Sequence, residues 1–496
     1  MRRISLALAT SFGLIASLIA PASAIAEYAC APTKALNQFS TRSITSLGFG
    51  VELGEINFDP GVANPGFLNT KVTWAKGSLS RVNFVAAQAP TGETSSQYKL
   101  AADVAALAYI NTDYYNEGSR FPYSAVLRGG ELTYAPNHPT NVVAMAEQPY
   151  ALATGYPGSS SLKSGTTTIV VTGVNTGLLN AASIATVITP EYVPKALPAH
   201  QAALWVDAGK VVKVYSKPAT YKVKTGVLIV ANGAHANRIR SLKVGARVSY
   251  KLAPMPAPKR VLVSDRVWAA GKVSTGGVTL SIRSVNSDVL SAAANLYDSH
   301  YSQNRGTLEG RYTLIVNADG KLRSKFWGGT ATAVAPGTKV IQLGNDGLAL
   351  YKAAVVGADV VIENSYATRS GLKLLEASGR GGDLLISGKT IQVCYPRTEE
   401  VRPRTAIGWN NKTGEIWLAT ASSGNFLADP GFRVGGSTIR QMAEWLRQLG
   451  ATDAVTVDGG GSTTFMAKTG GAIHRVDLPD QAWIREIPIG VALSPK

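Results

Sequence analysis

The feature that most constrains the fold is a helix followed by a buried strand and a glycine-rich turn near the C-terminus. The segment GGSTIRQMAEWLRQLG predicts an amphipathic helix that is capped by Ser437 or Thr438 and stops at Gly450. The apolar run after it predicts a short buried strand over residues 453–457, which leads into Asp458. The buried stripe of the helix consists of Ile439, Met442, Ala443, Leu446 and Leu449.

Two further segments predict β-hairpins. The segment TAIGWNNKTGEIWLATA predicts a strand to Trp409, a turn over residues 410–414 and a second strand from Glu415. The segment RFPYSAVLRGGELTY predicts a hairpin that turns at Gly129 and Gly130. The chain contains 50 glycines and only 16% charged residues, which favours a β-rich protein with many turns.

The turn after the C-terminal strand has the composition of an anion or polyol site. Glycines allow close approach of a ligand to the backbone, and successive amides can form an anion-binding nest. The carboxylate of Asp458 can act as a base, a nucleophile or a metal ligand. The alternative is a tight structural turn with a capping aspartate. The residues that follow Asp458 are Gly459, Gly460, Gly461, Ser462, Thr463 and Thr464.

Two hydrolase motifs and a zinc site are excluded. The turn lacks the G-K-[ST] of a P-loop and the G-x-S-x-G of a nucleophile elbow. The histidines have no H-x-x-x-H spacing, which argues against zinc. They are His138, His200, His235, His300 and His474.

The first 26 residues have the pattern of a secretory signal peptide. Arg2 and Arg3 precede an interrupted apolar stretch, and small residues give an A-x-A cleavage site at Ala24 or at Ala26. The alternative is a retained membrane anchor, which the short apolar run disfavours. No later stretch is long and apolar enough to span a bilayer, so we expect a secreted protein without stable membrane insertion.

Cysteine and charge fit an extracytoplasmic chain. Cys30 and Cys394 predict one disulfide in an oxidising compartment, with two free thiols as the alternative. Cleavage removes two arginines and lowers the formal charge from +17 to +15. The positive charges are scattered, which argues against nucleic-acid binding. A basic surface would concentrate anionic wall polymers or phosphoglycans.

The middle of the chain contains an internal repeat. The segment from Asn175 is echoed from Asn286, at an offset of 111 (286 minus 175). The glycines at 226 and 245 are echoed at 337 and 357, at offsets of 111 and 112. This pattern predicts a duplicated β-rich module with copies over residues 165–252 and 261–365. The alternative is that unrelated hairpins resemble one another.

The C-terminal segment resembles the phosphodiester glycosidase family. The resemblance is carried by RPRTAIGW, the amphipathic helix and LGATDAVTVDGGGSTTFMA, and it spans roughly Gly388 to Val491. A weaker match lies upstream, in AALAYINTDYYNEGSRFPYSAVLRGGEL. The chain departs from the family in having Asn175-Thr176 and Asn286-Ser287 where the family tends to have Asn-Arg. The duplicated module is not part of the family's minimal domain.

The resemblance implies cleavage of a bond between a sugar's anomeric carbon and a phosphate. Arg404, with Arg402 as a further candidate, would neutralise the phosphate; one such contact contributes about 1.5–3 kcal/mol. An oxocarbenium-like centre needs a nearby carboxylate, for which Asp458 is the first candidate and Asp113 the second. Asn111 would hydrogen-bond sugar hydroxyls, and the turn glycines would hold the phosphate.

Each of these candidates has a structural alternative. Arg404 could pair with Asp458 to hold the fold, Asn111 could cap a turn, and Asp113 could be a solvated turn residue. The remaining predicted substrate-binding residues are Thr405, Gly459, Gly460, Gly461, Ser462 and Thr463. No cofactor is established, although carboxylates and hydroxyls could accept calcium or magnesium.

These inferences predict an α+β fold, a mixed sheet with packed helices that is interrupted by the duplicated module. Residues 27–150 and 366–496 would together form the glycosidase-like domain. The predicted function is a secreted hydrolase of sugar-1-phosphodiesters whose partner is a carbohydrate or sugar-phosphate polymer. The alternatives are a non-catalytic glycopolymer-binding protein of the same fold and a glycosidase acting on polysaccharide without phosphate. The sequence does not indicate an oligomeric state.

Overall fold

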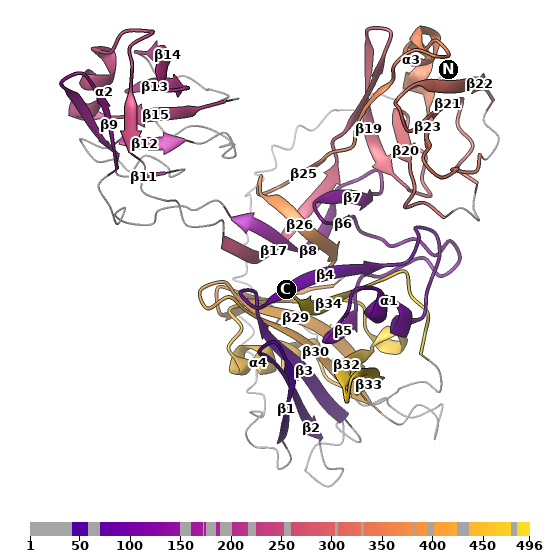
Figure 1. Cartoon of the computed structure of the whole chain (residues 1–496). Helices are drawn as coiled ribbons and strands as arrows, with labels where there is room; N and C mark the ends of the chain where they lie inside the picture. The colour runs from indigo at the N-terminus through magenta and orange to yellow at the C-terminus, as the bar shows by residue number, and fades with distance from the viewer. Residues whose placement is uncertain are drawn as a thin grey trace, which may run out of the picture.

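The computed structural model shows a chain built from packed β-sheets (Figure 1). The predicted signal peptide, Cys30, Cys394 and Asn175 lie outside the described residues. Among the described residues, none of the helices has the length and apolar character needed to cross a membrane. The structure describes residues 42–57, 70–148, 160–171, 173–174, 185–188, 201–216, 225–251, 259–302, 306–328, 332–380, 382–393, 401–423, 436–477 and 484–496.

An eight-stranded sheet and a five-stranded sheet, here named the β5 sheet, face each other across one core (Figure 1). Ile407 of the first sheet packs in the same cluster as Ile110 and Leu493 of the second. The eight-stranded sheet runs β1 (Arg42–Gly48), β2 (Val51–Asn57), β3 (Thr70–Ser78), β30 (Glu415–Ser423), β29 (Arg404–Asn410), β31 (Asp453–Thr456), β27 (Leu384–Ser387) and β28 (Thr390–Ile391). The β5 sheet runs β33 (Ala472–Arg475), β32 (Phe465–Thr469), β5 (Ala108–Asn111), β34 (Ile489–Pro495) and β4 (Val82–Gln88).

The predicted C-terminal helix is confirmed as α4 (Ile439–Leu449), which packs on the other face of the eight-stranded sheet. Thr438 caps it in a capping box with Gln441, so two otherwise unpaired groups of the first turn are satisfied. Gly450 ends it with φ 111°, a conformation that favours glycine. Because both faces of the sheet are covered, five consecutive residues of β29 are buried.

A six-stranded sheet connects this pair of sheets to the rest of the chain. Successive side chains along a strand point to opposite faces, so Val143 packs in the core shared with the β5 sheet while Val142 packs in a second core. Its hairpin turns at Gly129 and Gly130, as predicted. The order is β25 (Tyr366–Thr368), β17 (Lys259–Ala269), β8 (Thr140–Gln148), β26 (Lys373–Gly379), β6 (Val126–Arg128) and β7 (Glu131–Tyr134).

The remaining strands form two sets with the same pairing order. The first set contains β10 (Thr167–Val171), β9 (Ser160–Ser164), β16 (Ser249–Lys251), β11 (Gly173–Val174), β12 (Ala185–Ile188), β15 (Val227–Ala231), β13 (Ala202–Asp207), β14 (Lys210–Tyr215) and α2 (Gly233–Arg240). The second contains β19 (Val278–Val285), β18 (Lys272–Thr275), β24 (Val361–Glu363), β20 (Ala294–Tyr297), β23 (Lys339–Leu343), β21 (Tyr312–Val316), β22 (Leu322–Trp327) and α3 (Leu348–Ala353). The first set pairs as a three-stranded and a five-stranded sheet, whereas the second pairs as one seven-stranded sheet in which β19 takes the places of both β10 and β11. The duplicated module stays a prediction.

The predicted α+β class with packed helices is wrong, because the protein is predominantly β. Of the four α-helices in the described residues, the longest is α4 with 11 residues. The segment YKLAADVAALAYIN predicts a helical pattern followed by a buried strand that ends at Asn111, and this is confirmed as α1 (Gln97–Asp103) and β5 (Ala108–Asn111). The predicted domain boundaries stay predictions.

Candidate functional site

The candidate site lies where the β5 sheet and the eight-stranded sheet meet. β5 ends at Asn111, β29 begins at Arg404, and the turn with Asp458 follows β31. Two backbone hydrogen bonds hold the turn against the start of β29: Val457 N donates to Thr405 O at 3.0 Å, and Gly460 N donates to Pro403 O at 2.9 Å. Segments that are distant in the sequence therefore converge at one place.

Asn111 links the two sheets. Its Nδ2 donates to the main-chain carbonyl of Asp458 at 2.7 Å. Its Oδ1 accepts from Thr405 Oγ1 at 2.9 Å and from Thr464 N at 3.1 Å. The residue is fully buried. These contacts use the amide within the protein, so the geometry favours a positioning role over the predicted contact with sugar hydroxyls.

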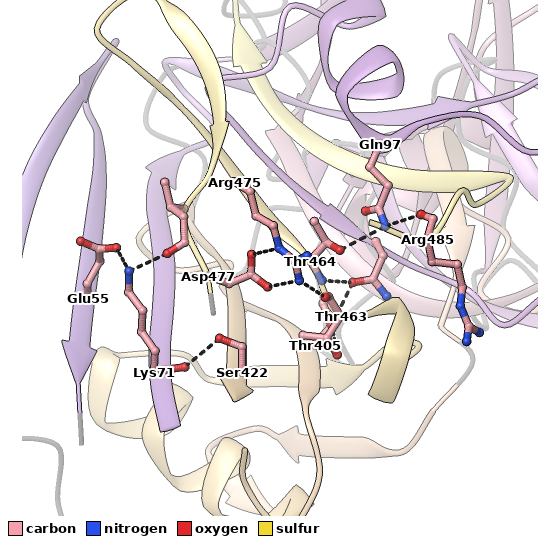
Figure 2. A network of polar contacts seen from close by, with 12 residues as sticks. Glu55, Lys71, Gln97, Thr405, Ser422, Thr463, Thr464, Arg475, Asp477 and Arg485 are labelled. Atoms are coloured by element: carbon pink, nitrogen blue, oxygen red, sulfur yellow. Dashed lines mark hydrogen bonds and ion pairs between the residues drawn. The ribbon is translucent and has the colours of Figure 1, made fainter. Parts of the chain in front are cut away.

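A second layer of polar contacts supports this junction (Figure 2). Thr463 lies within hydrogen-bonding distance of Thr405, at 3.4 Å between the hydroxyls, and its carbonyl accepts from Arg475. Arg475 also forms an ion pair of 2.8 Å with the buried Asp477. Gln97 Nε2 donates to Thr464 Oγ1 and to the Arg485 carbonyl, at 3.1 and 3.0 Å. The predicted residues Thr405 and Thr463 therefore belong to a buried network.

Asp458 is a buried carboxyl group with a raised pKa. Only 8% of the residue is exposed, and burial raises its pKa to about 6. A hydrogen bond from Ser462 and the charge of Arg485 act in the opposite direction, as does the amide of Gly459. At neutral pH the group is therefore mainly ionised but readily protonated, a state suited to acid–base work.

Asp113 is buried more deeply, and burial raises its pKa to about 7. That value already includes two hydrogen bonds from Ser124, from N at 2.7 Å and from Oγ at 3.1 Å, which lower the pKa, and the charge of Asp458, which raises it. Gly379 packs directly against this carboxyl, since a Cβ there would lie 2.0 Å from Asp113 Cγ. The predicted alternative of a solvated turn residue does not describe this environment.

Arg404 lies in the same region. Burial raises the pKa of Tyr114, the charge of Asp458 adds to the rise and that of Arg404 opposes it, so all three groups lie near one another. Arg404 Nε also donates to Ser437 O at 3.4 Å. Arg402 pairs with Ser437 through the main chain, and its side chain is exposed.

The turn glycines are less open than a free anion nest. The amide of Gly460 donates to Pro403 O, and the amides of Ser462 and Thr463 donate within the turn to Gly459 O and Gly460 O. Gly459 lies tightly against β29, since a Cβ there would lie 2.8 Å from Pro403 O. Phosphate contact at this turn would therefore fall mainly to Gly461 and to guanidinium groups.

Arg485 is a site residue that the sequence did not reveal. It pairs with Glu117 at 2.8 Å, and its charge lowers the pKa of Asp458. It also hydrogen-bonds Tyr115, where burial raises the pKa of the phenol and the charge of Arg485 opposes that rise. No local pattern surrounds Arg485, so only the upstream aromatic segment, which it contacts, could have pointed to it.

No group of three or more His, Cys, Asp or Glu side chains arranged to hold a metal ion occurs in the described ranges. Calcium or magnesium would therefore need hydroxyl and main-chain oxygens in addition to carboxylates. The predicted divalent cation stays a prediction.

Comparison with known proteins confirms the family resemblance. Residues 311–494 match the family model of phosphodiester glycosidases. The match starts well before Gly388, within the predicted second copy of the module, so it extends further upstream than the sequence motifs indicated. It includes Arg404, Asp458 and Arg485, whereas Asn111 and Asp113 lie outside it. A search of the curated proteins found no match.

The solved structures that are similar to this chain include the following three. A hypothetical protein from Synechocystis has a TM-score of 0.50 and 14% identity over 92% of this chain. The chain covers 64% of that protein's length, and the likeness shows the fold alone. A putative exported protein from Burkholderia pseudomallei has a TM-score of 0.44 and 16% identity, over 87% of this chain and 76% of that one. The zebrafish N-acetylglucosamine-1-phosphodiester alpha-N-acetylglucosaminidase catalytic domain, auto-inhibited by its pro-peptide, has a TM-score of 0.32 and 10% identity, over 90% and 83%.

Proposed function

We propose that the protein hydrolyses the glycosidic bond between a sugar's anomeric carbon and a phosphate in an extracellular or cell-envelope glycopolymer. The observation that carries this proposal is the convergence of Asp458, Asp113 and Arg404 beside Tyr114, with Asp458 and Arg404 in the part of the chain that matches phosphodiester glycosidases. Convergent, perturbed carboxyls beside a cation are typical of catalytic sites.

The chemistry requires charge neutralisation more than leaving-group protonation. The bond between C1 and the phosphate oxygen breaks, the electron pair leaves with the phosphate, and water supplies the new oxygen at C1. Arg404 and Arg485 provide positive charge for the leaving phosphate, in the forked geometry that guanidinium groups offer. The carboxylate of Asp458 stabilises the oxocarbenium-like centre or activates the water.

Asp113 acts through Asp458. The residue is 1% exposed, and its carboxyl group accepts two hydrogen bonds from Ser124, so it does not contact a substrate directly. Two coupled carboxyls do not ionise equally, and the more deeply buried one retains its proton longer. Protonation of Asp113 near neutral pH leaves Asp458 as the ionised member of the pair. We therefore assign Asp113 a positioning and electrostatic role.

The basic character of the chain and the predicted signal peptide support an anionic substrate outside the cell. Cleavage of the predicted signal peptide leaves a formal charge of +15 (17 minus 2), which would raise the local concentration of polyanions. Wall polymers and phosphoglycans have both the sugar and the phosphate that the site needs. The predicted location is therefore secreted or associated with the cell wall, with no nucleic-acid partner.

Substitution of Asp458 tests the proposal. Asp458→Asn keeps the side-chain size and removes the charge, so turnover of a panel of sugar-1-phosphodiesters, followed by release of the sugar, should fall by at least 100-fold. Asp103→Asn, at an exposed helix end, is the matched control and should keep its activity. Equal activity of the wild type and Asp458→Asn, or cleavage confined to glycosides without phosphate, would refute the proposal.

A non-catalytic glycopolymer-binding protein is the second candidate. It is favoured by the internal hydrogen bonds of Asn111 and of the turn amides, which leave few groups of the turn for a reaction. It predicts binding of wall polymer by the wild type without turnover of any phosphodiester or glycoside.

A further inference from the structure

Three arginines lie side by side across the six-stranded sheet, away from Asp458. Arg266 of β17 is paired with Asn141 of β8. On one side, Arg369 N donates to Arg266 O at 3.0 Å; on the other, Arg380 N donates to Asn141 O at 3.1 Å. Neighbouring strands lie about 4.8 Å apart, so the three guanidinium-bearing residues fall within roughly 15 Å. We name Arg369, Arg266 and Arg380 the arginine row.

The arginine row lines a cavity of about 450 Å³. Arg266 and Leu262 lie on the same face of β17, because alternate residues of a strand point the same way. Leu262 packs in the core shared with the β5 sheet, so this face of the six-stranded sheet is turned toward the eight-stranded sheet. Trp409 and Asp453 of that sheet form the opposite wall. The cavity therefore lies between two sheets and is large enough for a sugar unit with its phosphate.

Arg380 offers a hydrogen-bond donor in this cavity. Its side chain is half-buried, and one terminal nitrogen donates to Ser264 Oγ at 3.1 Å. Its Nε is buried and has no hydrogen-bond partner among the described residues. A buried donor without a partner costs about 1–3 kcal/mol, which an oxyanion in the cavity would offset.

The acidic groups of the cavity wall are held by neutral donors. Asp265 accepts from the amides of Arg266 and Ser370, at 2.7 and 3.2 Å, and from the Ser370 hydroxyl. Asp453 accepts from Gly388 N at 3.1 Å and from Thr452 Oγ1 at 2.9 Å. A third carboxylate, Asp383, acts on Arg380: burial lowers the pKa of this guanidinium group, and the charge of Asp383 opposes that change.

The placement of Arg369 beside Arg266 is unfavourable for the sheet itself. Like charges on directly neighbouring strands destabilise a sheet. An anion bound between the two would offset this repulsion, since phosphate and carboxylate accept forked hydrogen bonds from guanidinium groups.

The cavity and the candidate site share two chain segments. The turn after β26 contributes Gly379, which packs against Asp113, and then Arg380. Strand β31 contributes Asp453 to the cavity at its start and leads to Asp458 after its end. The two places are therefore joined by the same two chain segments.

We propose that the arginine row binds a phosphate group of the substrate polymer at a repeat other than the one cleaved. This inference rests on the proposed function and deepens it, because it makes the preferred substrate a chain with several phosphates. The row anchors the chain, while Asp458 acts on the neighbouring linkage.

The test uses the full chain with Asp458→Asn, in which turnover is blocked, and adds Arg266→Gln together with Arg369→Gln. Calorimetry measures binding of a phosphate-linked glycan of several repeats, of the same glycan after removal of phosphate, and of inorganic phosphate. One charge-assisted hydrogen bond corresponds to about tenfold in affinity, so the double substitution should weaken polymer binding by at least tenfold. Both arginines are exposed, so the fold should be retained.

A matched control separates a site from general charge. Arg283→Gln with Arg323→Gln removes the same charge from exposed positions in β19 and β22, and polymer binding should stay within twofold. Without Asp458→Asn, the Arg266/Arg369 variant should cleave a single sugar-1-phosphodiester at the wild-type rate and show a raised KM for the polymer.

Three results would overturn the inference: equal weakening by both double substitutions, equal binding of the dephosphorylated glycan, or binding of inorganic phosphate as tight as that of the polymer. The proposed function fails separately. Arginine-dependent polymer binding without turnover of any sugar phosphate by the wild type would keep the anion site and exclude the hydrolase.

Discussion

The side-chain amide of Asn111 donates a 2.7 Å hydrogen bond to the main-chain carbonyl of Asp458, 347 positions further along the chain. This contact joins the end of β5 to the turn after β31, and Thr405 and Thr464 complete the junction. The position of the candidate catalytic carboxyl group thus depends on a residue from the first quarter of the chain.

Asn111→Ala should lower both stability and activity. The substitution removes three hydrogen bonds and leaves the buried Thr464 amide without its acceptor, which costs about 2–4 kcal/mol in total. Chemical denaturation with urea checks the free energy of unfolding. Asn137→Ala, at an exposed position, should leave it unchanged. A loss below about 0.5 kcal/mol for Asn111→Ala would contradict the positioning role.

Gly379→Ala should displace Asp113. The added methyl group would lie 2.0 Å from Asp113 Cγ, so the carboxyl or the strand end must shift. Overpacking of this kind costs about 1–3 kcal/mol. We expect reduced turnover of a sugar-1-phosphodiester with little change in KM, because Asp113 does not contact the substrate. If the Gly379→Ala variant had the same kcat and KM as the wild type, Asp113 would have no influence on Asp458.

Arg485 and Glu117 should shift the pH profile of activity in opposite directions. The charge of Arg485 lowers the pKa of Asp458 and that of Glu117 raises it. Arg485→Gln should therefore move the acidic limb of the kcat/KM profile to higher pH, and Glu117→Gln should move it to lower pH. Two variants that move the limb in the same direction would show that it does not report Asp458.

Stability should fall as the pH rises from about 4 to 7. Burial raises the pKa of Asp458 from 3.8 to about 6 and that of Asp113 to about 7, so the folded state binds more protons than the unfolded state in this range. Ionisation of Asp458 in the folded state alone costs about 3 kcal/mol. Asp458→Asn should flatten the dependence of the unfolding free energy on pH, measured between pH 4 and 7. An unchanged slope would show that the Asp458 carboxyl is not desolvated.

The local elements were predictable because their signals are short-range. The capping box at Thr438, the αL glycine at 450 and the hairpin turn that ends at Gly414 each follow from a few neighbouring residues. The fold class was not predictable in the same way. It depends on how strands pair across the sheets, and β3 with β30 or β5 with β34 are pairs of segments far apart in the sequence.

The site was predictable only in part. Asp458 and Arg404 lie in a recognisable motif, and the structure places both beside Tyr114. Arg485 and Ser124 act on the two carboxyls through tertiary contacts that no sequence spacing encodes. The arginine row escaped detection for a related reason, since its members are neighbours across strands and not along the chain.

Strand β34 occupies the middle of the β5 sheet, between β5 and β4, and not its edge. Asn111 therefore cannot be held in its final register until residues 489–495 have been synthesised and inserted between two earlier strands. A nascent chain, or one shortened before this strand, would lack the partner that holds Asn111 in place. The order of synthesis thus delays assembly of the candidate site until residues 489–495 are available to fold.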